Sequence, residues 1–201
     1  MNKATIFVEL AALALLSTSA LAVTTTSPQN NKEQVHSMWC WNASVRNLIY
    51  TESNGKRDLW QCDIGNFVFG VNYACRFNNT FSWKDRANGG NWLKKDGTRD
   101  IYSILNKYGF NRLRHYPAAL SFFHMQQSIN HNHGVLTAWL WKKGGGHIVV
   151  AYGYNALADG SKWVKISDPW PGEGEYWRTY EEYVGGKDAD HTTAGTLRVI
   201  D

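Results

Sequence analysis

The chain has 201 residues and a formal net charge of +4 at neutral pH, and it contains ten tryptophans and ten tyrosines. This length corresponds to one domain, or two small lobes, with enough apolar residues to bury a core. The basic residues are scattered among acidic ones and form no run suited to phosphates, which argues against a nucleic-acid-binding protein.

The first 22 residues have the features of a secretory signal peptide. Lys3 supplies a positive charge, Leu10–Leu16 is apolar, and residues 20–22 (Ala-Leu-Ala) match the small-residue cleavage pattern. We therefore expect cleavage before Val23, a secreted or periplasmic protein, and no stable membrane association afterwards. Glu9 interrupts the apolar region, which leaves an uncleaved short anchor as the alternative, although the stretch is too short to span a bilayer.

After a polar leader at residues 23–33, the domain is expected at residues 34–201. Apolar residues at helical spacing predict four helices, at Ser37–Tyr50, Arg57–Phe69, Thr98–Tyr108 and Ser121–Asn130. Ser37 is the candidate N-cap of the first helix, and Gly65 weakens the second. Residues 78–97 are polar and rich in glycine and are expected to be irregular.

The second half of the chain has the pattern of strands. Short branched or aromatic runs separated by turn signals predict five of them, at Gly134–Trp141, His147–Tyr154, Lys162–Ser167, Glu175–Tyr180 and Thr196–Ile200. Helices followed by strands indicate an α+β fold in two lobes, a helical lobe at about residues 34–118 and a β lobe at about 119–201. The cleft between the lobes is the expected active site.

Three cysteines in an exported protein suggest one disulfide and one free thiol. Cys62 and Cys75 are 13 positions apart and can close a loop, which would contribute about 3 kcal/mol. Cys40 is then the odd thiol, although pairings that involve Cys40 stay open at this point.

A thiol, an imidazole and a carboxylate follow one another as Cys40, His147 and Asp168. In this order they are the parts of a cysteine nucleophile, its base and the group that orients the base. The start of a helix and a nearby imidazolium both stabilise a thiolate. The backbone N–H of Cys40 and the side-chain amide of Gln34 are the candidate donors to an oxyanion. Trp170 is expected either to shield the His147–Asp168 contact or to fill the core.

Three motifs resemble those of papain-like cysteine peptidases. Gln34 lies six positions before Cys40-Trp41, the run His147–Tyr154 (HIVVAYGY) ends in Gly-Tyr, and Asp168 is followed by Pro-Trp-Pro-Gly. The residues Met38–Trp41 and those that follow Asp168 most resemble the corresponding residues of small bacterial avirulence-effector-type papain-like peptidases. The resemblance implies a papain-like two-lobe fold, with the cysteine on the helical lobe and the histidine and aspartate on an antiparallel β lobe.

The resemblance also implies an endopeptidase that acts on protein or peptide substrates through a thioester and needs no cofactor. Asp168 stands where plant and lysosomal members carry asparagine, and a carboxylate is chemically adequate there. The leader at residues 23–33 is too short for an inhibitory propeptide. Control by an internal propeptide is therefore not expected, and a separate inhibitor or immunity-type protein is one substitute for it.

Two other functions fit the same residues. A peptidoglycan amide hydrolase or an acyl transferase would use the same cysteine–histidine pair, and an inert aromatic-rich binding module would use neither. The sequence His131-Asn132-His133 could be half a metal site, but with no carboxylate or thiol close in sequence an exposed loop is the better interpretation, and no metal is predicted.

Overall fold

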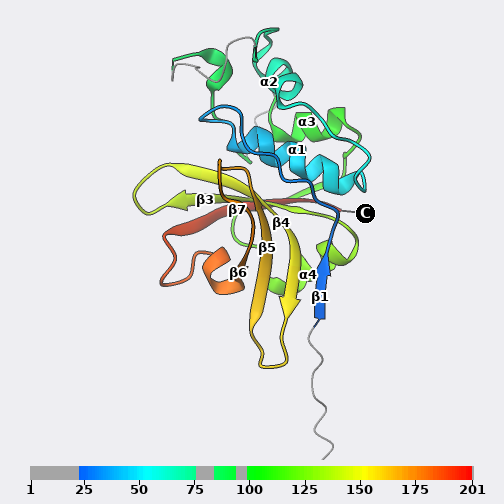
Figure 1. Cartoon of the computed structure of the whole chain (residues 1–201), viewed down its shortest axis with the longest axis vertical. Helices are drawn as coiled ribbons and strands as arrows, with labels where there is room; N and C mark the ends of the chain where they lie inside the picture. The colour runs from blue at the N-terminus through cyan, green and yellow to red at the C-terminus, as the bar shows by residue number, and fades with distance from the viewer. Residues whose placement is uncertain (1–22, 76–83, 94–98, 201) are drawn as a thin grey trace, which may run out of the picture.

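The computed structural model describes residues 23–75, 84–93 and 99–200, so the predicted signal peptide and parts of the predicted irregular region lie outside it. Three helices and a short 3-10 helix form one lobe, and seven strands with two further helices form the other (Figure 1). The helical lobe contains α1 (Cys40–Glu52), α2 (Gln61–Phe69), η1 (Arg86–Asn88) and α3 (Ile101–Lys107).

Helix α1 is the central element of the helical lobe. Residues 41–49 are all buried, because the helix lies between α2 and α3 on one side and the sheet on the other. The helix begins at Cys40, three residues later than predicted, with Trp39 at the N-cap position and no side-chain cap. Ser37 is therefore not the cap, and its Oγ instead accepts a hydrogen bond from Asn88 Nδ2 at 2.9 Å.

Helix α2 contains the predicted weak point at Gly65. A Cβ atom at this position would lie 2.5 Å from the ring of Trp39, so the glycine lets α2 pack directly on the indole. The helix starts at Gln61 and not at Arg57. Its Cys62 forms the expected disulfide with Cys75, with their Cα atoms 5.5 Å apart, and Cys40 is the free thiol.

The sheet is antiparallel and has the strand order β2-β7-β3-β4-β5-β6, with β1 paired to β4. Strand β4 is the longest and pairs with β3, β5 and β1. The strands are β1 (Val23–Thr26), β2 (Leu113–Tyr116), β3 (Val135–Trp141), β4 (Gly146–Ala156), β5 (Lys162–Asp168), β6 (Gly174–Thr179) and β7 (His191–Val199).

Two strands lie where the sequence predicted none. Val23–Thr26, inside the predicted leader, forms β1 and pairs with residues 153–156 of β4. Leu113–Tyr116, inside the predicted helical lobe, forms β2 and pairs with the C-terminal strand β7. Both are four-residue edge segments, and their strand state comes from the partner strand, which no local pattern reveals. The lobes are therefore less separate in sequence than predicted.

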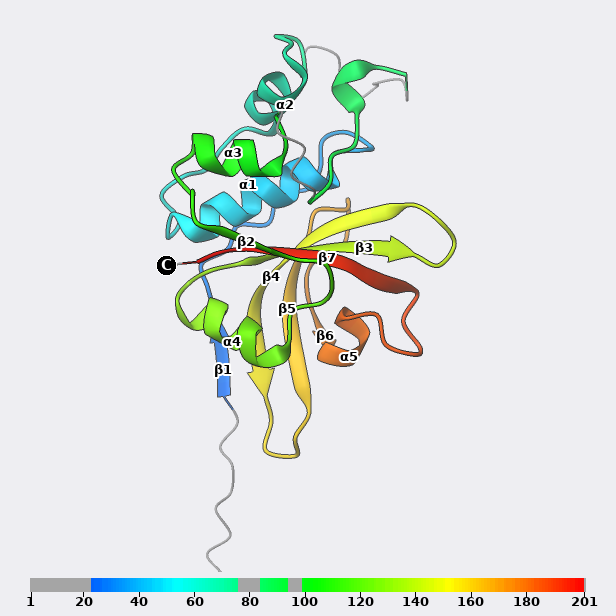
Figure 2. The ribbon, with the colours of Figure 1, turned by 180° about the vertical axis from the view of Figure 1, so that it is seen from behind.

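Two hydrophobic cores cover the two faces of the sheet. Alternate residues of β4 serve different cores, Ile148 and Val150 facing α1 and α3, and Val149 and Ala151 facing the opposite side. The opposite core is closed by α4 (Phe122–Asn130) and α5 (Tyr180–Tyr183), which Figure 2 shows on that side of the sheet. The α+β fold class with a helical and an antiparallel β lobe is confirmed.

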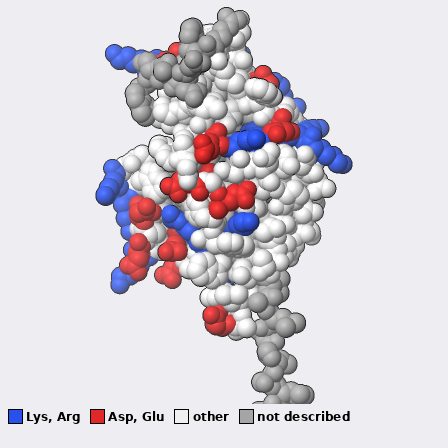
Figure 3. All heavy atoms as spheres, in the orientation of Figure 1, with Lys and Arg blue, Asp and Glu red and all other residues white. Residues whose placement is uncertain are grey.

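No helix among the described residues is long and apolar enough to cross a bilayer. On the face seen in Figure 3, acidic and basic side chains are interspersed over the β lobe.

Candidate active site

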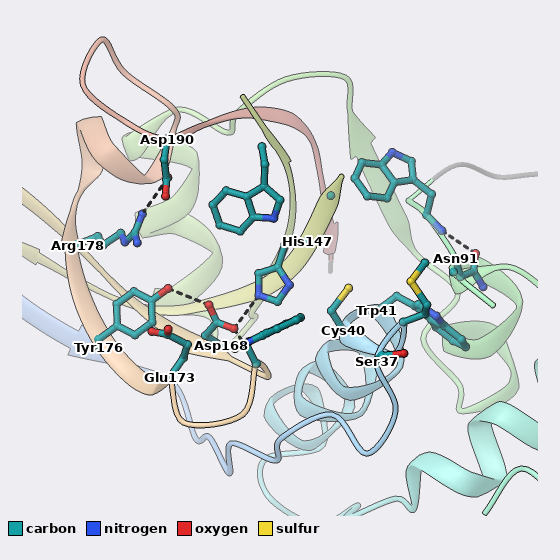
Figure 4. A pocket seen from close by; sticks show the side chains of 16 residues that line it. Ser37, Cys40, Trp41, Asn91, His147, Asp168, Glu173, Tyr176, Arg178 and Asp190 are labelled. Atoms are coloured by element: carbon teal, nitrogen blue, oxygen red, sulfur yellow. Dashed lines mark hydrogen bonds and ion pairs between the residues drawn. The ribbon is translucent and has the colours of Figure 1, made fainter. Parts of the chain in front are cut away.

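A cavity of about 490 Å³ lies between the two lobes and brings three of the four predicted site residues together. Its wall includes Cys40 from the start of α1, His147 from β4 and Asp168 from the end of β5. Figure 4 shows the sulfur of Cys40 and the ring of His147 facing each other across this cavity, with Asp168 behind the ring. Residues more than 100 positions apart in the chain thus meet at one place.

Hydrogen bonds between α1 and the sheet hold the thiol close to the imidazole. Ser44 lies one helical turn after Cys40, and its Oγ donates a 2.6 Å hydrogen bond to the backbone carbonyl of Ile148, the neighbour of His147. Further along α1, Asn47 Nδ2 donates to Oγ of Ser167, the neighbour of Asp168, at 3.2 Å. Both bonds are buried, so they fix the register between the helix and the strands that carry the site.

Cys40 occupies the first position of a 13-residue helix. The first N–H groups of an α-helix have no intrahelical acceptor, and the helix dipole is positive at this end. The helical hydrogen bonding begins only with Ala43, whose N–H donates to the carbonyl of Trp39 at 3.0 Å. The site therefore offers a partly buried thiol and free backbone donors at the same helix end.

His147 is 4% exposed and has a defined orientation. Its Nε2–H donates to Asp168 Oδ1 at 2.7 Å, which leaves Nδ1 on the side of the ring that faces the thiol of Cys40. Trp141 stacks on the ring with centroids 6.0 Å apart, and Trp170 meets it edge-on at 6.2 Å. Trp170 is 51% exposed, so it is not a core residue, and its edge-on contact with the His147 ring is compatible with the predicted shielding role.

The surroundings of His147 favour its protonated form. Burial lowers the pKa of His147, but the hydrogen bonds with Asp168 and Cys40 and the charges of both groups outweigh it and raise the pKa from 6.5 to about 9. The ring is therefore an imidazolium at neutral pH. An imidazolium beside a thiol is the arrangement that stabilises a thiolate nucleophile.

Asp168 is held by three donors. Oδ1 accepts from His147 Nε2 and from the backbone N–H of Trp170 at 2.8 Å, and Oδ2 accepts from the hydroxyl of Tyr176 at 3.0 Å. Asp168 is 4% exposed, so these bonds replace most of its hydration. The sequence analysis missed Tyr176, because only the pairing of β5 with β6 brings it to the carboxylate.

Gln34 has a different position from the one predicted for an oxyanion donor. Its side-chain Nε2 donates to the carbonyls of His36 and Ser37, at 2.9 and 3.0 Å, so both amide hydrogens are engaged. Gln34 is buried and does not line the cavity. Its backbone N–H donates to the carbonyl of Pro169 at 2.7 Å, which ties this segment to the Asp168 loop. In this conformation Gln34 stabilises the turn that leads into Cys40.

Tryptophans form much of the cavity wall. Trp92, Trp141 and Trp170 line it with partly or largely exposed side chains, and Trp41 lies behind the wall as a fully buried core residue. The sequence did not distinguish the three accessible tryptophans from those of the core. Beyond His147 the wall becomes polar, with Glu173, Tyr176, Arg178 and Asp190.

His133, one of the two histidines considered as half a metal site, has a structural partner in Glu52. His133 Nδ1 lies 2.7 Å from Glu52 Oε2 at the C-terminal end of α1. Within the part of the chain that the structure describes, no group of three or more histidine, cysteine or acidic side chains is arranged to hold a metal ion.

The sequence model of the Peptidase_C39 like family matches residues 24–189. The chain belongs to this family. The match confirms the predicted class, a papain-like cysteine protease. It also includes most of the predicted leader, in agreement with the place of β1 in the sheet.

No curated protein matches the sequence. Among solved structures, the chain is similar to the bromelain protease from Ananas comosus in complex with the E64 inhibitor. The identity is 12% and the TM-score 0.47, and the similarity covers 86% of this chain and 94% of that chain.

Proposed function

We propose that this Peptidase_C39-like protein is an exported endopeptidase whose reaction is carried by Cys40, His147 and Asp168. The observation that supports this assignment best is the arrangement on the wall of the cavity between the lobes, where the thiol faces the imidazole and the imidazole is hydrogen-bonded to the carboxylate. Because its pKa is raised, His147 is protonated at neutral pH and can give the leaving group the proton that it requires.

In the proposed mechanism the Cys40 thiolate attacks the carbonyl carbon of the scissile peptide bond. The carbonyl oxygen becomes an oxyanion, which the backbone N–H of Cys40 can hold at the helix end. His147 then gives the proton on Nδ1 to the leaving nitrogen, the C–N bond breaks, and a thioester remains. Asp168 keeps Nε2–H bound throughout, so the ring stays oriented. Water then attacks the thioester while Nδ1 takes its proton, and the carboxylic acid and the thiolate are released.

The predicted role of Gln34 in the oxyanion site requires a rearrangement. Its amide would have to leave the carbonyls of His36 and Ser37 before it could donate to an oxyanion. We propose the Cys40 N–H as the principal donor and keep Gln34 as the second candidate, to be tested by substitution.

The first test is the alkylation rate of Cys40 by iodoacetamide as a function of pH, in the wild type and in His147→Ala. We expect fast alkylation well below pH 8 in the wild type and its loss in the variant. A rate that rises only near about pH 8.5, as for an ordinary cysteine, and is unchanged in the variant would contradict the mechanism and favour the binding-module alternative. Cleavage of unfolded casein should disappear in Cys40→Ala and His147→Ala, while their circular dichroism spectra stay unchanged.

A second candidate, a peptidoglycan amide hydrolase or acyl transferase, is favoured by the three accessible tryptophans in the cavity wall, Trp92, Trp141 and Trp170, because aromatic faces bind sugar rings as well as peptides. Release of stem-peptide fragments from purified cell walls, without cleavage of casein, would support this candidate. Both candidates use the same thioester chemistry, so the alkylation experiment does not depend on the choice.

Export is proposed from the N-terminal pattern and is supported by the Cys62–Cys75 disulfide, since disulfides persist mainly in oxidising compartments. Mass determination of the exported protein should give Val23 as its first residue. The closer resemblance to avirulence-effector-type peptidases and control by a separate inhibitor or immunity-type protein are also proposals. Co-purification of such an inhibitor with the Cys40→Ala protein would support the second.

A further inference from the structure

Tyr176 lines the cavity but has no part in the mechanism described so far. Its hydroxyl lies 3.0 Å from Asp168 Oδ2, and Figure 4 shows the phenol on the side of the carboxylate away from His147. The other carboxylate oxygen, Oδ1, receives His147 Nε2–H and the backbone N–H of Trp170. The two oxygens of Asp168 therefore have separate partners, the imidazole on one side and the phenol on the other.

The register of the sheet places Tyr176 beside Asp168. Strands β5 and β6 pair so that Asp168 faces Gly174 and Ile166 faces Tyr176. Tyr176 is thus the diagonal neighbour of Asp168 on the same face of the sheet. A Cβ at Gly174 would meet no atom within 4 Å, so the space directly opposite Asp168 is open and the phenol can lean across it.

The direction of this hydrogen bond is fixed by chemistry. An ionised carboxylate only accepts, so the tyrosine hydroxyl must be the donor. Burial of Tyr176 and the charge of Asp168 raise the pKa of the phenol above its ordinary value of 10, so it keeps its proton at every pH at which the protease would work. Arg178 lies over the same ring at 5.5 Å from the centroid and limits its movement.

We propose that Tyr176 is a positioning residue that acts through Asp168, by holding the carboxylate in the rotamer that directs Oδ1 to His147. This proposal rests on the proposed function of Asp168 as the orienting group. Without the phenol hydroxyl, Oδ2 loses its partner inside the protein and the carboxylate is free to turn about its Cβ–Cγ bond. Nε2–H of His147 then loses its acceptor for part of the time, and Nδ1 no longer faces the thiol in a fixed geometry.

The test is Tyr176→Phe, which removes the hydroxyl and keeps the ring. We expect kcat to fall about tenfold, as for the loss of one hydrogen bond to a charged group, with KM changed by less than about twofold. Tyr180→Phe is the matched control, because its hydroxyl donates to the carbonyl of Leu120 at 2.8 Å and it does not line the cavity. The control should keep its kcat, and thermal melting of both variants shows whether the fold is equally affected.

A double-mutant cycle separates positioning from a direct contact with substrate. In the Asp168→Ala background, Tyr176→Phe should have no further effect, because there is no carboxylate left to hold. The alkylation rate of Cys40 at pH 6 measures the same cycle where turnover is slow. An additive effect in this background, an increase in KM alone, or an unchanged kcat in Tyr176→Phe would each overturn the proposal. Asp168→Ala with wild-type activity would overturn the proposed function itself, so the two failures are distinguishable.

Discussion

The raised pKa of His147 predicts that this residue stabilises the fold at neutral pH and loses that effect in alkaline solution. A group whose pKa is higher in the folded than in the unfolded state stabilises the folded state while it is protonated in both. The stabilisation is therefore fully present below pH 6.5, the ordinary pKa of histidine, and is lost as the pH rises through about 9. The perturbation to test is His147→Gln, which removes the titration and keeps a polar side chain.

The expected magnitude follows from the size of the shift. A rise in pKa from 6.5 to about 9 corresponds to about 3 kcal/mol, at about 1.4 kcal/mol for each factor of ten. Because His147 is only 4% exposed, solvent screening reduces this value little. Part of it comes from Cys40 and part from Asp168, so the same comparison in a Cys40→Ser background, which also prevents autolysis, should give a smaller difference.

The assay is equilibrium unfolding in urea at pH 6 and at pH 10, for the wild type and for His147→Gln. We expect the wild type to lose up to about 3 kcal/mol more than the variant between these pH values, because the variant lacks the titrating group. The groups that titrate in this range without contacting His147 are common to both proteins, so they cancel in the difference. The thiol of Cys40 is coupled to His147 and does not cancel, which is the second reason to repeat the comparison in the Cys40→Ser background. An equal loss of unfolding free energy in both proteins would refute the ion-paired state of His147. A larger loss in the variant would mean that the pKa of His147 is lowered and not raised by folding.

Three further predictions follow from the site and the disulfide. Asp168→Asn should keep part of the casein-cleaving activity, because the amide oxygen can still accept the hydrogen bond from Nε2–H of His147. Asp168→Ala should lose much more of this activity. Equal activity of the two variants would contradict the orienting role of Asp168. Gln34→Ala removes the donor to two backbone carbonyls and should cost about 1–3 kcal/mol in urea unfolding; a fall in kcat at temperatures where the variant is fully folded would show that Gln34 also serves the oxyanion. Replacing both Cys62 and Cys75 by serine should lower the free energy of unfolding by about 3 kcal/mol. The alkylation rate of Cys40 should stay unchanged, since neither cysteine of the bridge lines the cavity, and an altered rate would mean that the bridge shapes the cavity.

The sequence alone indicated the candidate catalytic residues and most of the helices and strands in their order. Cys40, His147 and Asp168 are recognisable because their residue types and neighbours are local properties of the chain. The predicted helices and the five predicted strands all have counterparts in the structure, since each has a periodic apolar pattern over enough residues to be read. The number of cysteines and the 13-residue spacing favoured a Cys62–Cys75 disulfide without excluding pairings with Cys40, and the structure has this disulfide.

The tertiary structure decided what depends on partners distant in the chain. Strands β1 and β2 are short edge segments that become strands by pairing with β4 and β7. Tyr176 meets Asp168 because of the register between β5 and β6, and the amide of Gln34 turns to backbone carbonyls that only the folded turn brings near. Hydrogen bonds between strands and across a cavity are set by the relative positions of whole elements, and these positions arise from packing over the entire sheet, which no local sequence pattern encodes.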